Sequence, residues 1–99
     1  MDIIGIGGAF IDLTYHVTDA RLAELGLQKA GISFVSPERQ RILIEANREA
    51  LTGISHGGSV ANSIYTAQKM GAQCAFASKI GNDSYGESFA AELAKHGVT

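Results

Sequence analysis

Apolar residues recur along this chain in two spacings, one typical of strands and the other of helices. Short runs of β-branched or alternating apolar residues predict strands at residues 2–7, 10–17, 32–35 and 73–79. Spacings of three and four predict two amphipathic helices, whose buried faces comprise Val60, Ile64, Ala67 and Met70 in the first and Tyr85, Phe89 and Leu93 in the second. Strands alternating with helices predict a parallel, doubly wound α/β sheet, because a parallel crossover needs a helix between its strands.

Capping residues predict where the first two helices begin and end. Thr18 or Asp19 caps a short helix that closes at Gly26, a residue free to adopt the left-handed conformation. A second helix begins at Ser36-Pro37-Glu38, because serine caps free N–H groups and proline is tolerated in the first turn. The sequence predicts that this helix continues to about Leu51.

The last part of the chain carries similar signals. Ser84 and Glu87 have the spacing of a capping box at the start of the last helix, Asp83 is an additional cap, and Gly97 ends the helix. The alternation then predicts that another strand begins at residues 97–99. Parallel strands without partners leave hydrogen-bonding groups uncovered, so we expect the sequence to be the amino-terminal part of a longer domain.

Composition and charge argue against several classes of protein. The 99 residues are 45% hydrophobic with a formal net charge of -2, which indicates a globular chain without a basic stripe for nucleic acid or anionic lipid. No segment has the length of a membrane span and no export signal is visible, so we expect a cytoplasmic protein. Cys74 is the only cysteine, and its apolar neighbours predict a core position rather than a reactive thiol.

The segment Gly57-Gly58-Ser59-Val60-Ala61-Asn62 is the strongest candidate for a binding site. Two glycines let the backbone approach a ligand closely, and the following helix presents free N–H groups. With Ser59 as the N-cap, Asn62 lies in the first turn, where its carboxamide faces the glycine turn and can both donate to and accept from a sugar hydroxyl. The alternative is an ordinary glycine connection followed by a capped helix.

Asp12 is the second candidate because it interrupts an apolar strand, between Ile11 and Leu13, where aspartate has poor propensity. A local inconsistency of this kind often marks function. A carboxylate accepts hydrogen bonds from two hydroxyls at once, which suits a vicinal diol. The alternative is an aspartate on the solvated face of an edge strand.

Two other patterns fall short of the sites they suggest. Gly5-x-Gly7-Gly8 lacks the third glycine of a dinucleotide fingerprint, because Phe10 stands there and a strand follows in place of a helix, which disfavours a nucleotide-binding oxidoreductase. His16, His56 and His96 lack metal-ligand spacing, so no metal site is predicted. His56 is interpreted as either a pocket wall or an exposed residue, and His96 as a partner of the last helix dipole.

Taken in order, these segments resemble the amino-terminal region of the ribokinase-like (PfkB) carbohydrate and nucleoside kinases, with the adenosine-kinase-like branch nearest. The resemblance covers nearly the whole chain and is carried by Ile3-Ile4-Gly5-Ile6-Gly7 with Asp12, by the glycine pair with Asn62, and by Ala75-Phe76-Ala77-Ser78-Lys79-Ile80-Gly81-Asn82-Asp83 with Gly86. It implies a Rossmann-like three-layer α/β fold with a small β lid, whose strands we expect within residues 10–36. It also implies that Asp12, Gly57, Gly58 and Asn62 bind substrate hydroxyls.

The function that the resemblance implies is ATP-dependent phosphorylation of a sugar or nucleoside hydroxymethyl group. Residues 1–99 would supply the substrate-binding part of a single kinase domain, whereas the general base and the ATP and Mg²⁺ sites belong to a carboxyl-terminal part that is absent. No residue is therefore assigned a catalytic role, and these 99 residues alone are expected to be inactive. The lid pairs subunits in some members, which implies a homodimer. The alternative is a non-catalytic sugar-binding or regulatory module on the same scaffold.

Overall fold

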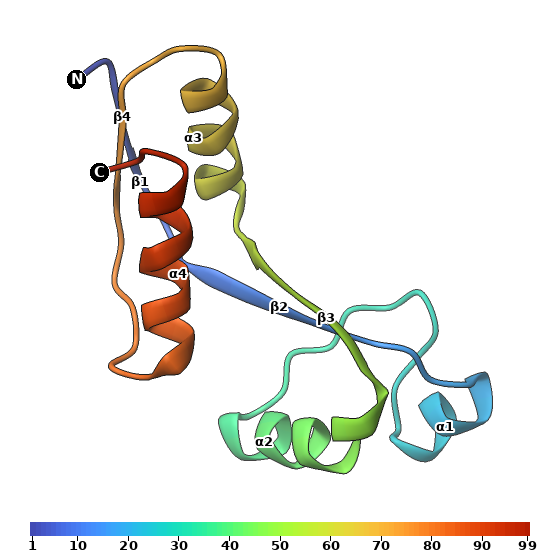
Figure 1. The fold of residues 1–99 in the computed structure, drawn as a ribbon. Coiled ribbons are helices and arrows are strands. Elements are labelled where there is room, and N and C mark those ends of the chain that lie inside the picture. Colours follow the sequence, from blue (N-terminus) through green and yellow to red (C-terminus); the bar gives the residue numbers. More distant parts are fainter. The chain divides into compact units, whose positions relative to one another are not determined.

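The computed structural model describes all residues, 1–99, and the chain divides into two compact units. Unit 1 comprises residues 1–12 and 54–99, and unit 2 comprises residues 13–53. The elements follow in the order β1 (Ile3–Ile6), β2 (Phe10–Tyr15), α1 (Asp19–Glu24), α2 (Pro37–Ala46), the 3₁₀ turn η1 (Arg48–Ala50), β3 (Leu51–Gly57), α3 (Ser59–Lys69), β4 (Cys74–Ala77) and α4 (Ser84–Lys95) (Figure 1). None of the helices is long and apolar enough to cross a membrane.

The sheet of unit 1 is parallel, as the sequence predicts. Strands β1 and β4 pair with Ile3 opposite Cys74 and with Gly5 opposite Phe76. The Thr99 N–H donates to the Cys74 carbonyl at 3.1 Å, and the Thr99 carbonyl accepts from the Phe76 N–H at 3.0 Å. Thr99 thus bonds to β4, but the strand predicted to begin at residues 97–99 is not formed in this chain.

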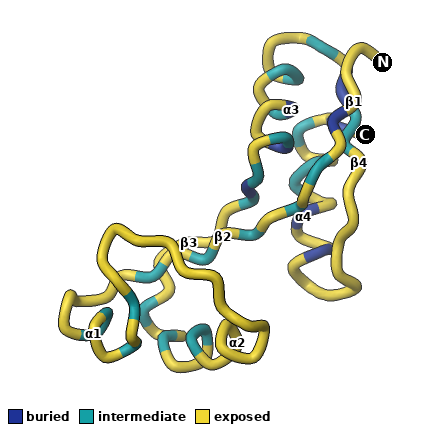
Figure 2. The backbone as a smooth tube through the Cα atoms, turned by 180° about the vertical axis from the view of Figure 1, so that it is seen from behind, coloured by how far each residue is buried: buried dark blue, intermediate teal, exposed yellow.

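Helices α3 and α4 both pack against the face of this sheet that carries Gly5 and Phe76. A Cβ atom on Gly5 would lie 2.7 Å from Ile64 Cγ1 of α3, so the helix approaches the strand more closely than an alanine would allow. The rings of Phe76 and Phe89 lie 6.1 Å apart, which joins α4 to the same face. The buried apolar residues of the chain all belong to unit 1 (Figure 2): Ala61, Ile64, Cys74, Phe89 and Val98. The predicted burial of Cys74 is confirmed.

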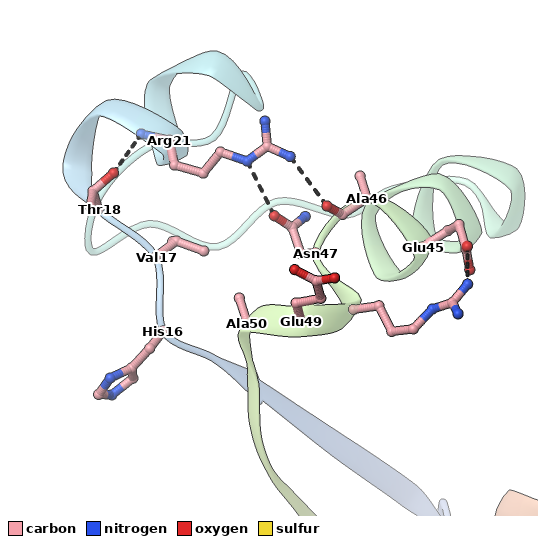
Figure 3. Close-up of a pocket in the computed structure, with 10 residues that line it drawn as sticks. His16, Val17, Thr18, Arg21, Glu45, Ala46, Asn47, Glu49 and Ala50 are labelled. Atoms are coloured by element: carbon pink, nitrogen blue, oxygen red, sulfur yellow. Dashed lines mark hydrogen bonds and ion pairs between the residues drawn. The ribbon is translucent and has the colours of Figure 1, made fainter.

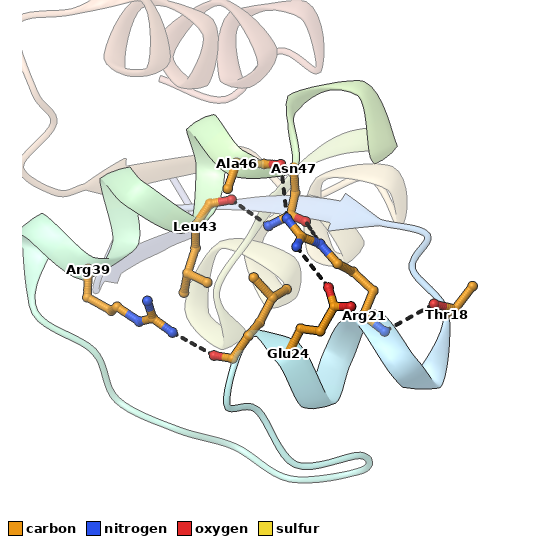
Figure 4. Close-up of polar contacts among 8 residues, drawn as sticks. Thr18, Arg21, Glu24, Arg39, Leu43, Ala46 and Asn47 are labelled. Carbon is orange, nitrogen blue, oxygen red and sulfur yellow. Dashed lines mark hydrogen bonds and ion pairs between the residues drawn. The ribbon is translucent and has the colours of Figure 1, made fainter.

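Unit 2 contains no buried residue, and polar contacts hold its helices together (Figure 4). Arg21 of α1 donates from Nε to Asn47 Oδ1 at 3.3 Å and from Nη2 to the Ala46 carbonyl at 3.3 Å, at the end of α2. The predicted caps are confirmed, since Thr18 and Ser36 each accept a hydrogen bond from the backbone N–H three residues later, at 3.1 Å. This unit therefore depends on hydrogen bonds rather than on a hydrophobic core.

The prediction that the second helix continues to Leu51 is wrong. Helix α2 ends at Ala46, and Leu51 begins β3, which pairs with β2. The His16 N–H donates to the Ala50 carbonyl at 3.0 Å, and the Thr52 hydroxyl donates to the Thr14 carbonyl at 3.2 Å. Pairing with a strand that is distant in sequence overrides the local helical pattern.

The strand predicted at residues 32–35 is also wrong. These residues form no regular element, and Ile32 and Phe34 are 91% and 99% exposed. A strand needs a hydrogen-bonding partner, and no backbone hydrogen bond joins these residues to β2 or β3, which pair with each other. Only one of the strands expected for the lid within residues 10–36 is therefore present, at Phe10–Tyr15.

Three smaller predictions fail at helix ends. Met70 lies just beyond α3 and is 82% exposed, and Tyr85 in the first turn of α4 is 43% exposed, so neither joins the core. The cap of α4 is Asp83, which accepts from the Gly86 N–H at 2.8 Å, whereas Ser84 is the first helical residue. Side chains in terminal turns project past the packed part of a helix, which is why helical spacing overstates their burial.

Candidate functional site

The structure brings Asp12 of β2 against Gly57, the last residue of β3. A Cβ atom on Gly57 would overlap Asp12 Oδ2 and would lie 3.4 Å from Asp12 Cγ. Gly57 is buried, whereas Asp12 is exposed. The glycine therefore leaves the space in which the Asp12 carboxylate rests against the turn, with its outer side open to solvent.

Gly58 is the N-cap of α3 and has φ 103° and ψ 134°, a conformation that L-residues with side chains rarely adopt. A Cβ atom at this position would also lie 2.9 Å from the Gly8 carbonyl oxygen and 3.0 Å from Phe10 Cδ2. Both the backbone conformation and the close approach of Gly8 thus require glycine here. The prediction that Ser59 is the N-cap is wrong, because Ser59 is the first helical residue.

Asn62 joins the glycine turn through its backbone, since its N–H donates to the Gly58 carbonyl at 2.9 Å. Its side chain is exposed and lines a shallow hollow of about 410 Å³ together with Ser63, Thr66 and Met70. No hydrogen bond joins the Asn62 carboxamide to the Asp12 carboxylate. The structure therefore groups Asp12, Gly57 and Gly58 closely and places Asn62 one helical turn along from them.

The polar groups around this turn are free to bind a ligand. Neither the Asp12 carboxylate nor the Asn62 carboxamide hydrogen-bonds within the chain, and no side chain caps the amino terminus of α3. The first N–H groups of a helix have no partner within the helix and carry partial positive charge. The site thus combines acceptors from Asp12 with donors from α3, which is the combination that a hydroxyl-rich ligand requires.

Two residues near the turn were not singled out as site residues from the sequence. The ring of Phe10 contacts both Gly8 and Gly58, and a Cβ atom on Gly7 would lie 2.8 Å from Val60 Cγ2. These side chains hold the glycine segments in place. The signal that could have identified them is the pairing of a large apolar residue with glycines that are distant in sequence.

A second hollow, of about 560 Å³, lies in unit 2 between the end of β2 and the end of α2 (Figure 3). Its walls include His16, Arg21, Asn47 and Arg48. The Arg21 guanidinium is already engaged by Asn47 and by the Ala46 carbonyl. We interpret this hollow as a structural junction, because its central cation is occupied by contacts within the chain.

No group of three or more histidine, cysteine, aspartate or glutamate residues gathers as metal ligands would. The sequence also has no glycine-lysine-serine/threonine string of a phosphate-binding loop.

Known structures share this arrangement of elements. The chain superposes with a TM-score of 0.79 and 23% identity on a probable sugar kinase from Rhizobium etli, covering 98% of this chain and 29% of that one. It superposes with a TM-score of 0.76 and 25% identity on adenosine kinase from Sinorhizobium meliloti, covering 98% and 29%. The values for Schistosoma mansoni adenosine kinase in complex with tubercidin are 0.80 and 18%, covering 98% and 30%. The predicted ribokinase-like α/β fold is confirmed.

These comparisons also set the scale of the chain, which spans less than a third of the length of each of these kinases. A comparison with curated protein sequences gave no match. The sequence matches the profile described as pfkB family carbohydrate kinase over residues 29–99, which is well over half of its length. The chain belongs to the pfkB family of carbohydrate kinases.

Proposed function

We propose that this chain is the substrate-binding part of a kinase that transfers the γ-phosphoryl group of ATP, with Mg²⁺, to a hydroxymethyl group of a sugar or nucleoside. The observation that carries the proposal is the contact between the Asp12 carboxylate and the glycine turn that begins α3. Family membership and the folds of the sugar and adenosine kinases support it. The ATP and Mg²⁺ sites are expected in a part of the protein outside residues 1–99.

Each site residue has a distinct task in this proposal. The Asp12 carboxylate accepts hydrogen bonds from two neighbouring hydroxyls, and Gly57 and Gly58 let the substrate approach the backbone. Asn62 adds a carboxamide that donates and accepts. Together these groups hold the acceptor hydroxymethyl group in one orientation, and positioning of this kind is a large part of phosphoryl-transfer catalysis.

The test is a panel of sugars and nucleosides, assayed with ATP and Mg²⁺ on the full-length protein that contains these residues. An Asp12→Asn substitution removes a charged acceptor of substrate hydroxyls. Such a bond contributes about 1.5–3 kcal/mol, so we expect KM to rise by roughly 10- to 150-fold. Asp19→Asn is the matched control, because Asp19 forms an exposed ion pair with Lys29 in unit 2 and should leave KM unchanged.

The outcomes separate the proposal from its alternative. If Asp12→Asn and the wild type have the same KM for every sugar or nucleoside that the enzyme phosphorylates, Asp12 is a surface residue and the assigned site is wrong. Saturable sugar binding without any phosphoryl transfer would instead identify a non-catalytic binding module. Residues 1–99 expressed alone should bind sugar weakly at best and should not turn over ATP.

The homodimer through the lid is part of the same proposal. Ile32 and Phe34, at 91% and 99% exposure, are apolar side chains that an interface would cover. Sedimentation of the full-length protein and of an Ile32→Ser, Phe34→Ser variant tests this point. A dimer that survives both substitutions would show that these residues are not the interface.

A further inference from the structure

A third cavity, outside the glycine turn, lies within unit 1 between β3, α3 and α4. Its volume is about 400 Å³, and its polar walls are Ser55 and His56 of β3, Tyr65 and Lys69 of α3, and Glu92 and His96 at the end of α4. A cavity of this size is within the range of small-molecule sites. No task in the proposed kinase function uses any of these six side chains.

Two hydrogen-bond donors in this cavity have no partner. The Tyr65 hydroxyl is buried and has no hydrogen-bond partner. Burial, with a contribution from the nearby Glu92 carboxylate, raises the pKa of Tyr65, so the phenol keeps its proton at neutral pH and remains able to donate. The Lys69 ammonium group, which carries three N–H donors, is bonded to no residue of the chain.

One acceptor oxygen of the same cavity is already engaged. Glu92 Oε1 lies 3.0 Å from His96 Nε2, and this hydrogen bond is the main reason that the pKa of Glu92 is lowered. His56 Nε2 lies 2.8 Å from the Ser88 hydroxyl. Glu92 Oε2 has no partner, but no hydrogen bond joins it to Tyr65 or Lys69. Both donors therefore remain available to a ligand, and the unpaired charge of Lys69 favours an anionic acceptor.

We propose that this cavity binds a phosphate-class oxyanion, with Lys69 and Tyr65 as its principal donors. The oxyanion is either free phosphate or the phosphate group of a small phosphorylated molecule. Its oxygens accept from the Lys69 ammonium and from the Tyr65 hydroxyl, and the remaining volume accommodates the body of a small ester. The inference does not depend on Asp12 or on the glycine turn, so it stands or falls separately from the proposed kinase function.

The experiment is a titration of ¹⁵N-labelled residues 1–99 with inorganic phosphate, at an ionic strength held constant with sodium chloride. Binding in the cavity predicts saturable shifts of the His56, Lys69 and His96 amide signals. Lys69→Met should weaken binding by about tenfold or more, because a charged hydrogen bond is lost. Lys79→Met is the matched control, since it removes the same charge from a residue outside the cavity and should leave the affinity unchanged.

Tyr65→Phe gives a second, independent readout. It removes only the hydroxyl that has no partner, so the melting temperature without phosphate should stay the same or rise. The affinity for phosphate should fall by several-fold, on the order of the loss of one hydrogen bond. If Tyr65 had only a structural role, the loss of its hydroxyl could not lower phosphate affinity without also changing the melting temperature. A titration with ribose 5-phosphate then distinguishes the sources, because tighter binding than inorganic phosphate identifies a phosphorylated small molecule and equal binding identifies free phosphate.

Three results would overturn the site. The first is a set of shifts that grows linearly with phosphate, or that chloride reproduces, which would indicate an adventitious ion only. The second is an equal phosphate affinity in Lys69→Met and Lys79→Met. The third is unchanged phosphate binding by a folded Tyr65→Phe variant.

Discussion

Replacing Gly58 by alanine tests whether the glycine turn is as constrained as the structure indicates. Gly58 begins α3 with φ 103° and ψ 134°, outside the regions that alanine occupies readily. The added methyl group would also lie 2.9 Å from the Gly8 carbonyl oxygen, which belongs to the backbone and cannot rotate away. Two independent penalties therefore act on the same substitution.

The magnitude follows from these two penalties. A residue with a side chain held in such a sparsely populated backbone region costs about 1–3 kcal/mol. Crowding against a neighbouring backbone in a packed region costs about 1–3 kcal/mol more. The sum is about 2–6 kcal/mol, and for a domain of this size each kcal/mol lowers Tm by roughly 4–8 °C. We therefore expect Gly58→Ala to lower Tm by at least about 8 °C.

The assay is thermal unfolding of residues 1–99 by circular dichroism, with Gly53→Ala as the control. Gly53 lies in β3 with no neighbour within 4 Å of an added Cβ atom and without a positive φ, so alanine there should be neutral or stabilise by up to about 1 kcal/mol. Equal melting temperatures for the two variants would refute the reasoning. They would show that the turn relaxes freely and that its shape is not fixed for binding.

Two further predictions concern stability. Phe89→Ala should destabilise the chain by about 3–5 kcal/mol, because Phe89 is 1% exposed, whereas Phe34→Ala at 99% exposure should change unfolding in urea by less than about 0.5 kcal/mol. The hydrogen bond from His96 is the chief reason that the pKa of Glu92 is lowered in the folded state. The Glu92 carboxylate therefore stabilises the fold above its ordinary pKa of 4.5, and this contribution is lost as the pH falls through the lower pKa of the folded state. The stability of Glu92→Gln should therefore depend less steeply on pH in acid than that of the wild type, and His96→Gln should show the same change. Identical acid unfolding profiles for the three proteins would contradict this prediction.

The elements that the sequence predicts well are those whose signals are local. Ser36 caps α2 and Gly97, with φ 76°, follows α4, because capping and left-handed turns depend only on adjacent residues. A strand within residues 73–79 and the parallel character of the sheet also follow from the alternation of strands and helices. Local chemistry thus predicts these helix ends and the parallel strands of unit 1.

The predictions that fail depend on partners that are distant in sequence. Residues 32–35 have the composition of a strand but form no backbone hydrogen bonds to one, and Leu51 leaves the predicted helix and begins β3, which pairs with β2. Composition measures how well a residue suits a strand, whereas pairing decides whether a strand forms. Sequence reasoning could not identify that partner without knowing the topology.

The candidate site was predictable in part for the same reason. The requirement for glycine at Gly58 follows from the sequence motif, but the contact between Asp12 and Gly57 depends on β2 and β3 meeting at this point. The cavity that contains Tyr65 and Lys69 was not predicted, because its walls come from three elements. The spacing signal that the sequence does carry is the i, i+4 separation of Tyr65 from Lys69 and of Glu92 from His96. Such clusters become visible only when the fold is known.

One face of the sheet formed by β1 and β4 is left exposed. Ile4 and Ile6 alternate with Gly5 along β1 and are 63% and 78% exposed, on the face opposite to the one that α3 and α4 cover. Parallel sheets are covered on both faces in stable α/β proteins. An apolar layer packed on Ile4 and Ile6 would give the sheet this second cover. Burial of both side chains would contribute about 1.5–3 kcal/mol each, which is large beside the narrow margin of a 99-residue chain.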